Sequence, residues 1–141
     1  MTKIDREISI ASSPEQIWPW MDILKWPEFS DIFTEVSLDN GNVALGAKAQ
    51  ITAGPGEEKV NYSAQITAFQ PSKKLAYSRS GGPLPGDSEW EILPAENGST
   101  VIYRNSFDHA LAEPVKESMA KTMERFLAQI KKVAENSQVK A

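Results

Sequence analysis

The sequence of 141 residues contains no cysteine and only one histidine, His109. The lack of cysteine excludes disulfides, thiol nucleophiles and thiolate metal ligands. Zinc and iron sites normally take several His or Cys ligands, so a single histidine predicts no metal site. No Gly-x-Ser-x-Gly motif is present to supply a nucleophile for His109 and its neighbour Asp108. We therefore expect no metal and no cofactor, and we expect His109 to be exposed or to cap a helix.

The chain also lacks an excess of positive charge and a long apolar run. Its formal net charge is −4, which gives no electrostatic attraction to nucleic acid or to an anionic membrane surface. No segment approaches the roughly 20 apolar residues of a membrane span, and the amino-terminal residues lack a signal-peptide pattern. We expect a cytoplasmic protein with no nucleic-acid partner and no stable membrane insertion. The length fits one domain, residues 1–141, ordered over about residues 3–135.

The longest run with helical periodicity covers residues 113–134. At about 100° per residue, its large apolar side chains fall on one arc: Val115, Met119, Met123, Phe126, Leu127, Ile130 and Val133. Burying all of them contributes roughly 10 to 20 kcal/mol as an upper estimate. The predicted helix therefore needs a concave apolar surface to pack against, and the rest of the chain must form it.

The remaining sequence predicts strands and two short helices. Alternating polar and apolar residues predict strands over residues 3–10, 33–38, 47–53, 60–68, 75–80, 88–93 and 100–107. Ser13 begins a short helix in which Gln16 closes a capping box, and Asp22 caps a second short helix. Short connections predict an antiparallel meander with the first strand at an edge. We predict an α+β helix-grip fold, in which a curved antiparallel sheet of about seven strands wraps around the long C-terminal helix.

These features resemble the START-like or Bet v 1-like superfamily, and within it the SRPBCC group of polyketide cyclase/dehydrase and lipid-transport proteins. The resemblance covers about residues 3–134 and is carried by Ala11–Trp18, Asp22, Trp26–Phe29, Gly46, Phe69–Pro71, Leu93–Pro94 and Gly98–Thr100. It implies a cavity between sheet and helix for a hydrophobic small molecule. Many members carry a His or a second aromatic on the sixth strand where Ser88–Glu91 stands here, so the resemblance transfers no catalytic residue.

Aromatic and methionine residues supply the candidate ligand contacts, although cavities and cores use the same residue types. The flexible side chains of Met119 and Met123 suit an irregular ligand, whereas the tryptophans near the short helices are expected to seal one end. The Gly81–Gly86 segment is predicted to border the cavity mouth. The predicted ligand-binding residues are Tyr62, Tyr77, Arg79, Trp90, Tyr103, Met119, Met123 and Phe126.

Arginines on the predicted inner faces bear on the chemistry of the ligand. Arg79 shares a strand face with Tyr77, and it points either into the cavity or to its rim, as does Arg6 on the first strand. A buried arginine without a carboxylate is costly, so an inward Arg79 or Arg104 needs Glu89, Asp87 or an acidic ligand group. We hypothesise an amphipathic ligand with an acidic or carbonyl head near Arg79 and Tyr77.

The last predicted strand can turn either of its faces inward. One face carries Val101, Tyr103, Asn105 and Phe107, and the other carries Ile102, Arg104 and Ser106. Aromatic residues on an outward face would suit a dimer contact, so we expect a monomer or a homodimer.

Three functions are compatible with these patterns. The leading prediction is a protein that binds a hydrophobic or amphipathic small molecule, lipid-like or polyketide-like, without transforming it. The second is a cyclase or dehydratase type of enzyme, in which Tyr62, Tyr77 or Tyr103 works with an inward Glu or Arg as general acid and base. The third is a protein–protein interaction module with a filled core and no ligand.

Overall fold

The alternating segments form one antiparallel sheet in the computed structural model, which describes residues 2–139. The strands are β1 (Thr2–Ile10), β2 (Phe33–Leu38), β3 (Lys48–Ala53), β4 (Val60–Gln70), β5 (Lys74–Ser80), β6 (Gly86–Ala95) and β7 (Gly98–Phe107). Their order is β1-β7-β6-β5-β4-β3-β2, so β1 and β2 are the two edges. The predicted meander with the first strand at an edge is confirmed.

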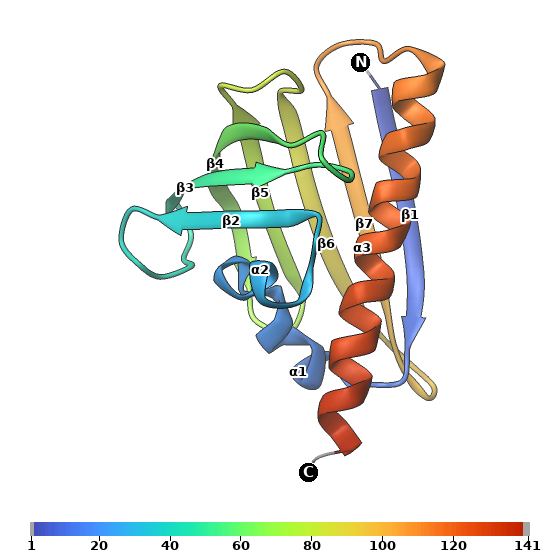
Figure 1. Cartoon of the computed structure of the whole chain (residues 1–141). Coiled ribbons are helices and arrows are strands. Elements are labelled where there is room, and N and C mark those ends of the chain that lie inside the picture. The colour runs from blue at the N-terminus through green and yellow to red at the C-terminus, as the bar shows by residue number, and fades with distance from the viewer. Residues whose placement is uncertain (1, 140–141) are drawn as a thin grey trace.

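The long helix α3 (Glu113–Val139) runs alongside β1 and β7 on the inner side of the curved sheet (Figure 1). Its predicted apolar stripe is buried from Met123 to Ile130, whereas Val133 is half-buried and Val115 near the helix start is 42% exposed. The helix continues past its predicted end at Ala134. The predicted helix-grip fold, a curved sheet around a long C-terminal helix, is confirmed.

Four single-turn segments connect β1 to β2: α1 (Pro14–Ile17), η1 (Trp18–Met21), η2 (Ile23–Lys25) and α2 (Trp26–Phe29). The predicted capping box between Ser13 and Gln16 is present, and Asp22 caps η2 by accepting from the Leu24 amide at 3.0 Å. Two helices were expected here, but Pro19 and Pro27 each interrupt helical hydrogen bonding. The segment therefore folds as separate turns.

An aromatic cluster, defined here as Trp26, Phe33, Trp90 and Phe126, fills the space between the short helices, the sheet and α3. The Trp26 ring lies 4.6 Å from Phe33, 5.0 Å from Trp90 and 4.9 Å from Phe126, measured between ring centroids. The Trp26 indole also donates to the Trp20 carbonyl at 2.8 Å. This end of the concave space is therefore closed by ordinary core packing.

The faces of β7, which the sequence left open, are assigned by burial. Val101, Tyr103, Asn105 and Phe107 are buried on the concave face. Arg104 lies on the opposite face. The aromatic residues of β7 therefore lie inside the fold and cannot supply the dimer contact considered above.

Within residues 2–139, the structure contains no helix that is both long enough and apolar enough to cross a membrane.

Candidate functional site

A cavity of about 470 Å³ lies between the concave face of the sheet and the first half of α3. The aromatic cluster fills the other half of this space, whereas here the helix presents small or flexible side chains. From α3 the lining residues are Pro114, Val115, Ser118, Met119 and Thr122. From the strands and loops they include Ile32, Phe33, Ala53, Val60, Tyr62, Arg79, Pro83, Leu84, Ser88, Tyr103, Asn105 and Phe107. The lining is predominantly apolar, and Pro83 and Leu84 of the Gly81–Gly86 segment belong to it.

The eight predicted ligand contacts separate into two groups. Tyr62, Arg79, Tyr103 and Met119 line the cavity, whereas Tyr77, Trp90, Met123 and Phe126 are buried in the core and do not line it. Met123 lies one helical turn after Met119, which places it beside the aromatic cluster. Tyr77 lies directly behind Tyr62, and their hydroxyl oxygens are 2.9 Å apart. Contact with a ligand remains a prediction for all eight residues.

Arg79 points inward and is 9% exposed. Its Nε donates to the Leu84 carbonyl at 3.1 Å, and its Nη2 donates to the Ser106 carbonyl at 2.6 Å. Its Nη1 donates to Ser88 Oγ at 2.5 Å and to Asn105 Oδ1 at 3.0 Å. These bonds fix the plane of the guanidinium in the cavity wall, and strands β5, β6 and β7 hold it jointly.

Two polar residues of this site, Ser88 and Asn105, were not among the predicted contacts. Ser88 faces Asn105 across the β6–β7 pair, and its hydroxyl donates to Asn105 Oδ1 at 2.5 Å. Strand alternation places Ser88 on the face of Trp90 and Asn105 on the face of Tyr103, which is the signal that could have identified them. We refer to Arg79, Ser88 and Asn105 as the Arg79 cluster.

Gly86 has no side chain and so leaves room for the guanidinium of Arg79. This glycine pairs with Arg79 in the β5–β6 ladder and has φ +154°. A Cβ atom there would lie 2.0 Å from the Ser106 carbonyl oxygen and 2.8 Å from Arg79 Nη2. Any larger residue would therefore displace both the strand and the arginine.

The carboxylates that the sequence offered as partners for Arg79 lie elsewhere. Glu89 projects from the other face of β6, where it pairs with Arg104 at 2.6 Å and with Lys74 at 3.7 Å. Asp87 is exposed on that same face. Neither residue neutralises Arg79. An inward Arg79 was expected to need either a nearby carboxylate or an acidic ligand group, and neither Glu89 nor Asp87 supplies the carboxylate.

Three tyrosines near the cavity keep their protons. Burial raises the pKa of Tyr62 above its ordinary value of 10.0, although the hydrogen bond with Tyr77 opposes the shift. Burial likewise raises the pKa of Tyr77, and the neighbouring Tyr62 adds to the increase. The pKa of Tyr103 is also raised by burial. At neutral pH these hydroxyls are hydrogen-bond donors and not phenolate bases.

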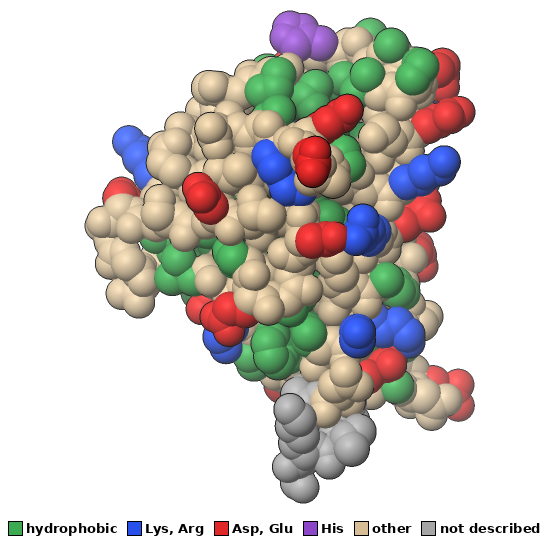
Figure 2. All heavy atoms as spheres, in the orientation of Figure 1, with side chains coloured by type: hydrophobic (Ala, Val, Ile, Leu, Met, Phe, Trp, Pro, Cys, Tyr) green, Lys and Arg blue, Asp and Glu red, His purple; other side chains and the backbone are tan. Residues whose placement is uncertain are grey.

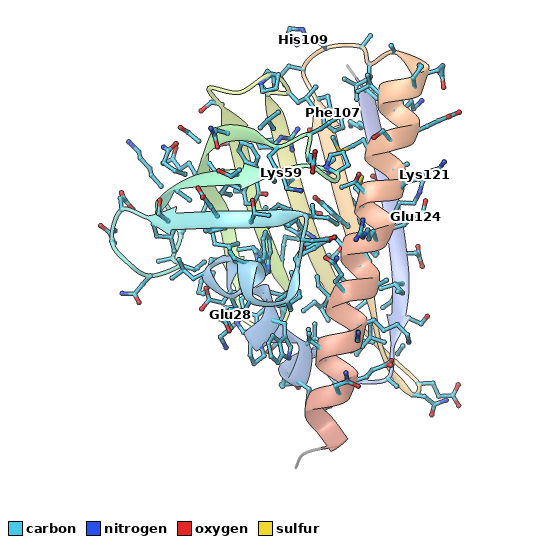
Figure 3. All side chains as sticks on the ribbon, in the orientation of Figure 1. Glu28, Lys59, Phe107, His109, Lys121 and Glu124 are labelled. Atoms are coloured by element: carbon cyan, nitrogen blue, oxygen red, sulfur yellow. The ribbon has the colours of Figure 1, made fainter. Side chains whose placement is uncertain are left out.

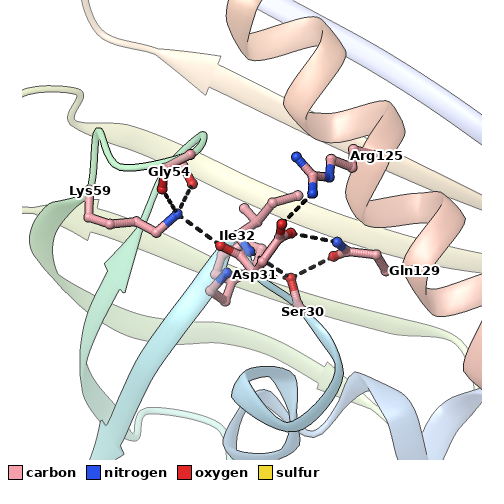
Figure 4. Close-up of polar contacts among 9 residues, drawn as sticks. Ser30, Asp31, Ile32, Gly54, Lys59, Arg125 and Gln129 are labelled. Atoms are coloured by element: carbon pink, nitrogen blue, oxygen red, sulfur yellow. Dashed lines mark hydrogen bonds and ion pairs between the residues drawn. The ribbon is translucent and has the colours of Figure 1, made fainter.

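Polar contacts join the elements at the mouth of the cavity (Figure 4). Asp31, just before β2, pairs with Arg125 of α3 and accepts from Gln129 Nε2 at 2.8 Å. The Lys59 ammonium donates to the carbonyls of Asp31 at 2.8 Å and Gly54 at 2.7 Å. Figure 2 shows acidic and basic side chains next to one another on this face, where β2 approaches α3. These contacts, which we call the Asp31 latch, tie the β3–β4 loop and β2 to the helix.

A second hollow of about 440 Å³ adjoins the cavity at this mouth. The two share Ile32, Pro55, Pro114, Ser118 and Thr122 as lining residues, and the outer hollow adds Glu117, Lys121 and Arg125. The path from solvent to the cavity therefore passes between α3 and the segments that the Asp31 latch connects.

His109 takes no part in this site. It is exposed, as expected, and points away from the cavity in the loop between β7 and α3 (Figure 3). Over the part of the chain that the structure describes, no group of three or more His, Cys, Asp or Glu residues could hold a metal ion.

A curved antiparallel sheet closed by a C-terminal helix, with a cavity between them, defines the helix-grip class. Residues 1–135 match the family described as polyketide cyclase/dehydrase and lipid transport, and the chain belongs to this family. Among curated proteins, none matches the chain by sequence.

Solved structures extend the likeness over nearly the whole chain. The Zhui aromatase/cyclase from Streptomyces sp. R1128 is 11% identical, with a TM-score of 0.79 over 95% of this chain and 93% of that chain. Ara h 8.0201 is 15% identical, with a TM-score of 0.77 over 96% and 98%. A START superfamily protein from Mycobacterium smegmatis is 12% identical, with a TM-score of 0.75 over 95% and 97%. The predicted membership of the polyketide cyclase/dehydrase and lipid-transport group is confirmed. At these identities the solved structures show a shared fold.

Proposed function

We propose that this protein binds a hydrophobic or amphipathic small molecule, lipid-like or polyketide-like, in the cavity between the sheet and α3 without transforming it. The observation that carries the proposal is the cavity itself: about 470 Å³, predominantly apolar, with its polar groups gathered around Arg79. Ligand sites typically have volumes of about 300 to 1,000 Å³ and few, convergent polar groups. The family description, which includes lipid transport, supports the same class of ligand.

The composition of the wall favours binding over the other two functions. An interaction module would have a filled core, whereas a cavity of about 470 Å³ is open under the first half of α3. An acid–base enzyme needs a group that accepts a proton near neutral pH. The cavity tyrosines hold their protons, and Glu58, the one carboxylate among the lining residues of the described chain, is exposed. The wall thus supplies hydrogen-bond donors without a buried base.

Titration with N-phenyl-1-naphthylamine, an uncharged fluorescent probe, tests the proposal in the full-length protein. Thr122→Phe places a ring in the cavity wall and is expected to weaken probe binding at least about tenfold. Ala128→Phe puts the same ring at an exposed position of α3 outside the cavity and should leave binding unchanged. Thermal unfolding of both variants verifies that they are folded.

Two results would contradict the proposal. One is a wild-type protein that does not enhance the fluorescence of the probe, and the other is equal affinity in the two phenylalanine variants. Native mass spectrometry of protein purified from its own host adds an independent measurement, because a bound apolar molecule should appear as a discrete mass increment.

A further inference from the structure

Arg79 differs from every other arginine of the protein in its partners. The chain has four arginines, and three of them pair with carboxylates: Arg6 with Glu124 at 2.9 Å, Arg104 with Glu89 and Glu91, and Arg125 with Asp31. These three side chains are between 37% and 57% exposed, so water already stabilises their charge. Arg79 is the buried one, and among the described residues no carboxylate lies within 4.0 Å of it.

The partners of Arg79 are all uncharged. Four of its N–H groups donate to backbone carbonyls, to a hydroxyl and to an amide oxygen, as described above. Its guanidinium also lies over the Phe107 ring, 4.9 Å from the centroid, in a cation–π contact. Neutral dipoles and a ring face satisfy hydrogen bonds and attract a cation weakly, but they supply no counter-charge. The cavity wall therefore holds a positive charge that is not paired with a carboxylate of the described residues.

The remaining hydrogen-bonding capacity limits what can compensate this charge. A guanidinium has five N–H groups, and the four bonds above leave one N–H of Nη2 that no described residue accepts, on a side chain that lines the cavity. Tyr62 and Tyr103 line the same cavity, but their hydroxyls already bond Tyr77 and Asn105. One arginine N–H suits a single oxygen of a compact, singly charged group. It does not supply the several cationic donors that a doubly charged phosphate ester normally recruits.

We propose that the cavity selects amphipathic monoanions, with a carboxylate or sulfonate group against Arg79 and the apolar body directed toward Met119 and Val115. The inference rests on the proposed binding function and narrows its ligand class from any amphipathic molecule to an acid. The Arg79 guanidinium then has a negatively charged partner only when the ligand is bound. The acidic group of the ligand therefore contributes to affinity beyond what burial of its apolar body supplies.

Two fluorescent probes that differ by one charged group test this directly. 8-Anilinonaphthalene-1-sulfonate and N-phenyl-1-naphthylamine share the same aromatic framework, and only the first carries a sulfonate. We expect the wild-type protein to bind the sulfonate probe at least about tenfold more tightly than the neutral one, the effect of one charge-assisted contact. Arg79→Gln should abolish this preference, so that the ratio of the two affinities falls to about one.

Arg104→Gln is the matched control, because it removes an arginine from the outer face of the same sheet. This variant should keep the preference of the wild type. Equal binding of both probes by the wild type, or a preference that survives in Arg79→Gln, would overturn the inference and leave the proposed function standing. Failure of both probes to bind would instead contradict the proposed function itself.

A measurement on the wild type alone covers the case in which Arg79→Gln does not fold. Decanoate and 1-decanol have chains of the same length, and each can compete with bound N-phenyl-1-naphthylamine. Decanoate should displace the probe at a concentration about tenfold lower, although decanol is the more apolar of the two. Displacement by decanol at an equal or lower concentration would overturn the selection for an anion.

Discussion

The two halves of α3 carry the same apolar stripe but face different surroundings. Met123, Phe126 and Ile130 in the second half are buried against the aromatic cluster and the sheet. Val115 and Met119 in the first half border the cavity, and Val115 is 42% exposed. Helical periodicity therefore identifies the side that faces inward, whereas the residues on the opposing sheet decide whether that side meets a core or a ligand.

The largest expected effect comes from the packed half. Phe126→Ala removes a fully buried ring that contacts Trp26, Phe33 and Trp90, and it should lower the free energy of unfolding by about 3 to 5 kcal/mol. Val115→Ala, at the other end of the same stripe, should change it by no more than about 0.5 kcal/mol. Urea denaturation of both variants measures the difference. Similar losses would show that the two halves of the helix are packed alike.

The two methionines give a closer comparison, because they are one turn apart. Met123→Ala should lower the free energy of unfolding by about 2 to 5 kcal/mol, since Met123 is fully buried. Met119→Ala should affect stability less and weaken binding of N-phenyl-1-naphthylamine by about fivefold, the effect of losing about 1 kcal/mol of apolar contact. Isothermal titration and thermal unfolding of both proteins separate the two effects. A Met119→Ala variant that loses stability and keeps its affinity would place Met119 in the core.

Stability at alkaline pH tests whether the hydroxyls of the three tyrosines, which lie between the packed core and the cavity, are buried. The folded-state pKa values of Tyr62, Tyr77 and Tyr103 are raised above 10.0 by burial, so their contribution to stability is complete below that pH. As pH rises above it, the unfolded chain loses these protons first, and stability falls. Thermal unfolding from neutral to strongly alkaline pH measures the fall, which should be smaller in Tyr103→Phe. An identical pH dependence in that variant would argue against burial of this hydroxyl.

A small effect on stability is also expected at the Asp31 latch, because both side chains of its ion pair are more than half exposed. Asp31→Ala should lower the free energy of unfolding by less than about 1 kcal/mol. It should nevertheless speed release of bound N-phenyl-1-naphthylamine, since the mouth loses the contacts of the Asp31 carboxylate with Arg125 and Gln129 of α3. Stopped-flow dissociation measures the rate. Glu124→Ala is the control, because it breaks the Arg6 ion pair of the same helix outside the mouth, and equal release from both variants would exclude a role of the latch in access.

The fold could be predicted because its determinants are local. Strand alternation, the Ser13 capping box and the helical stripe each depend on neighbouring residues, and the structure retains all three. Inward orientation of Arg79 was also within reach, since it shares a face with Tyr77. Its partners were not, because Ser88 and Asn105 meet it only through the register of three strands.

Other parts of the site depend on contacts that no sequence pattern reports. Met119 and Met123 occupy equivalent places on the stripe, so periodicity could not tell which would border a cavity. The Asp31 latch joins residues that are 94 positions apart along the chain. Aspartate is common on any protein surface, so no sequence pattern identifies this contact. Sequence patterns thus separated the two faces of each strand and of the helix, whereas the three-dimensional packing decided which face of β7 lies inward and which polar residues meet Arg79.

The absence of a side chain at Gly86 has a consequence for comparisons among relatives. A homologue can keep an arginine at the position of Arg79 and still lack this arrangement, because any Cβ atom at the position of Gly86 would collide with the Ser106 carbonyl and crowd the guanidinium. The useful signature in an alignment is therefore the pair, arginine on one strand and glycine opposite it on the next. Relatives that keep the arginine and replace the glycine should have diverged in ligand chemistry while retaining the same fold.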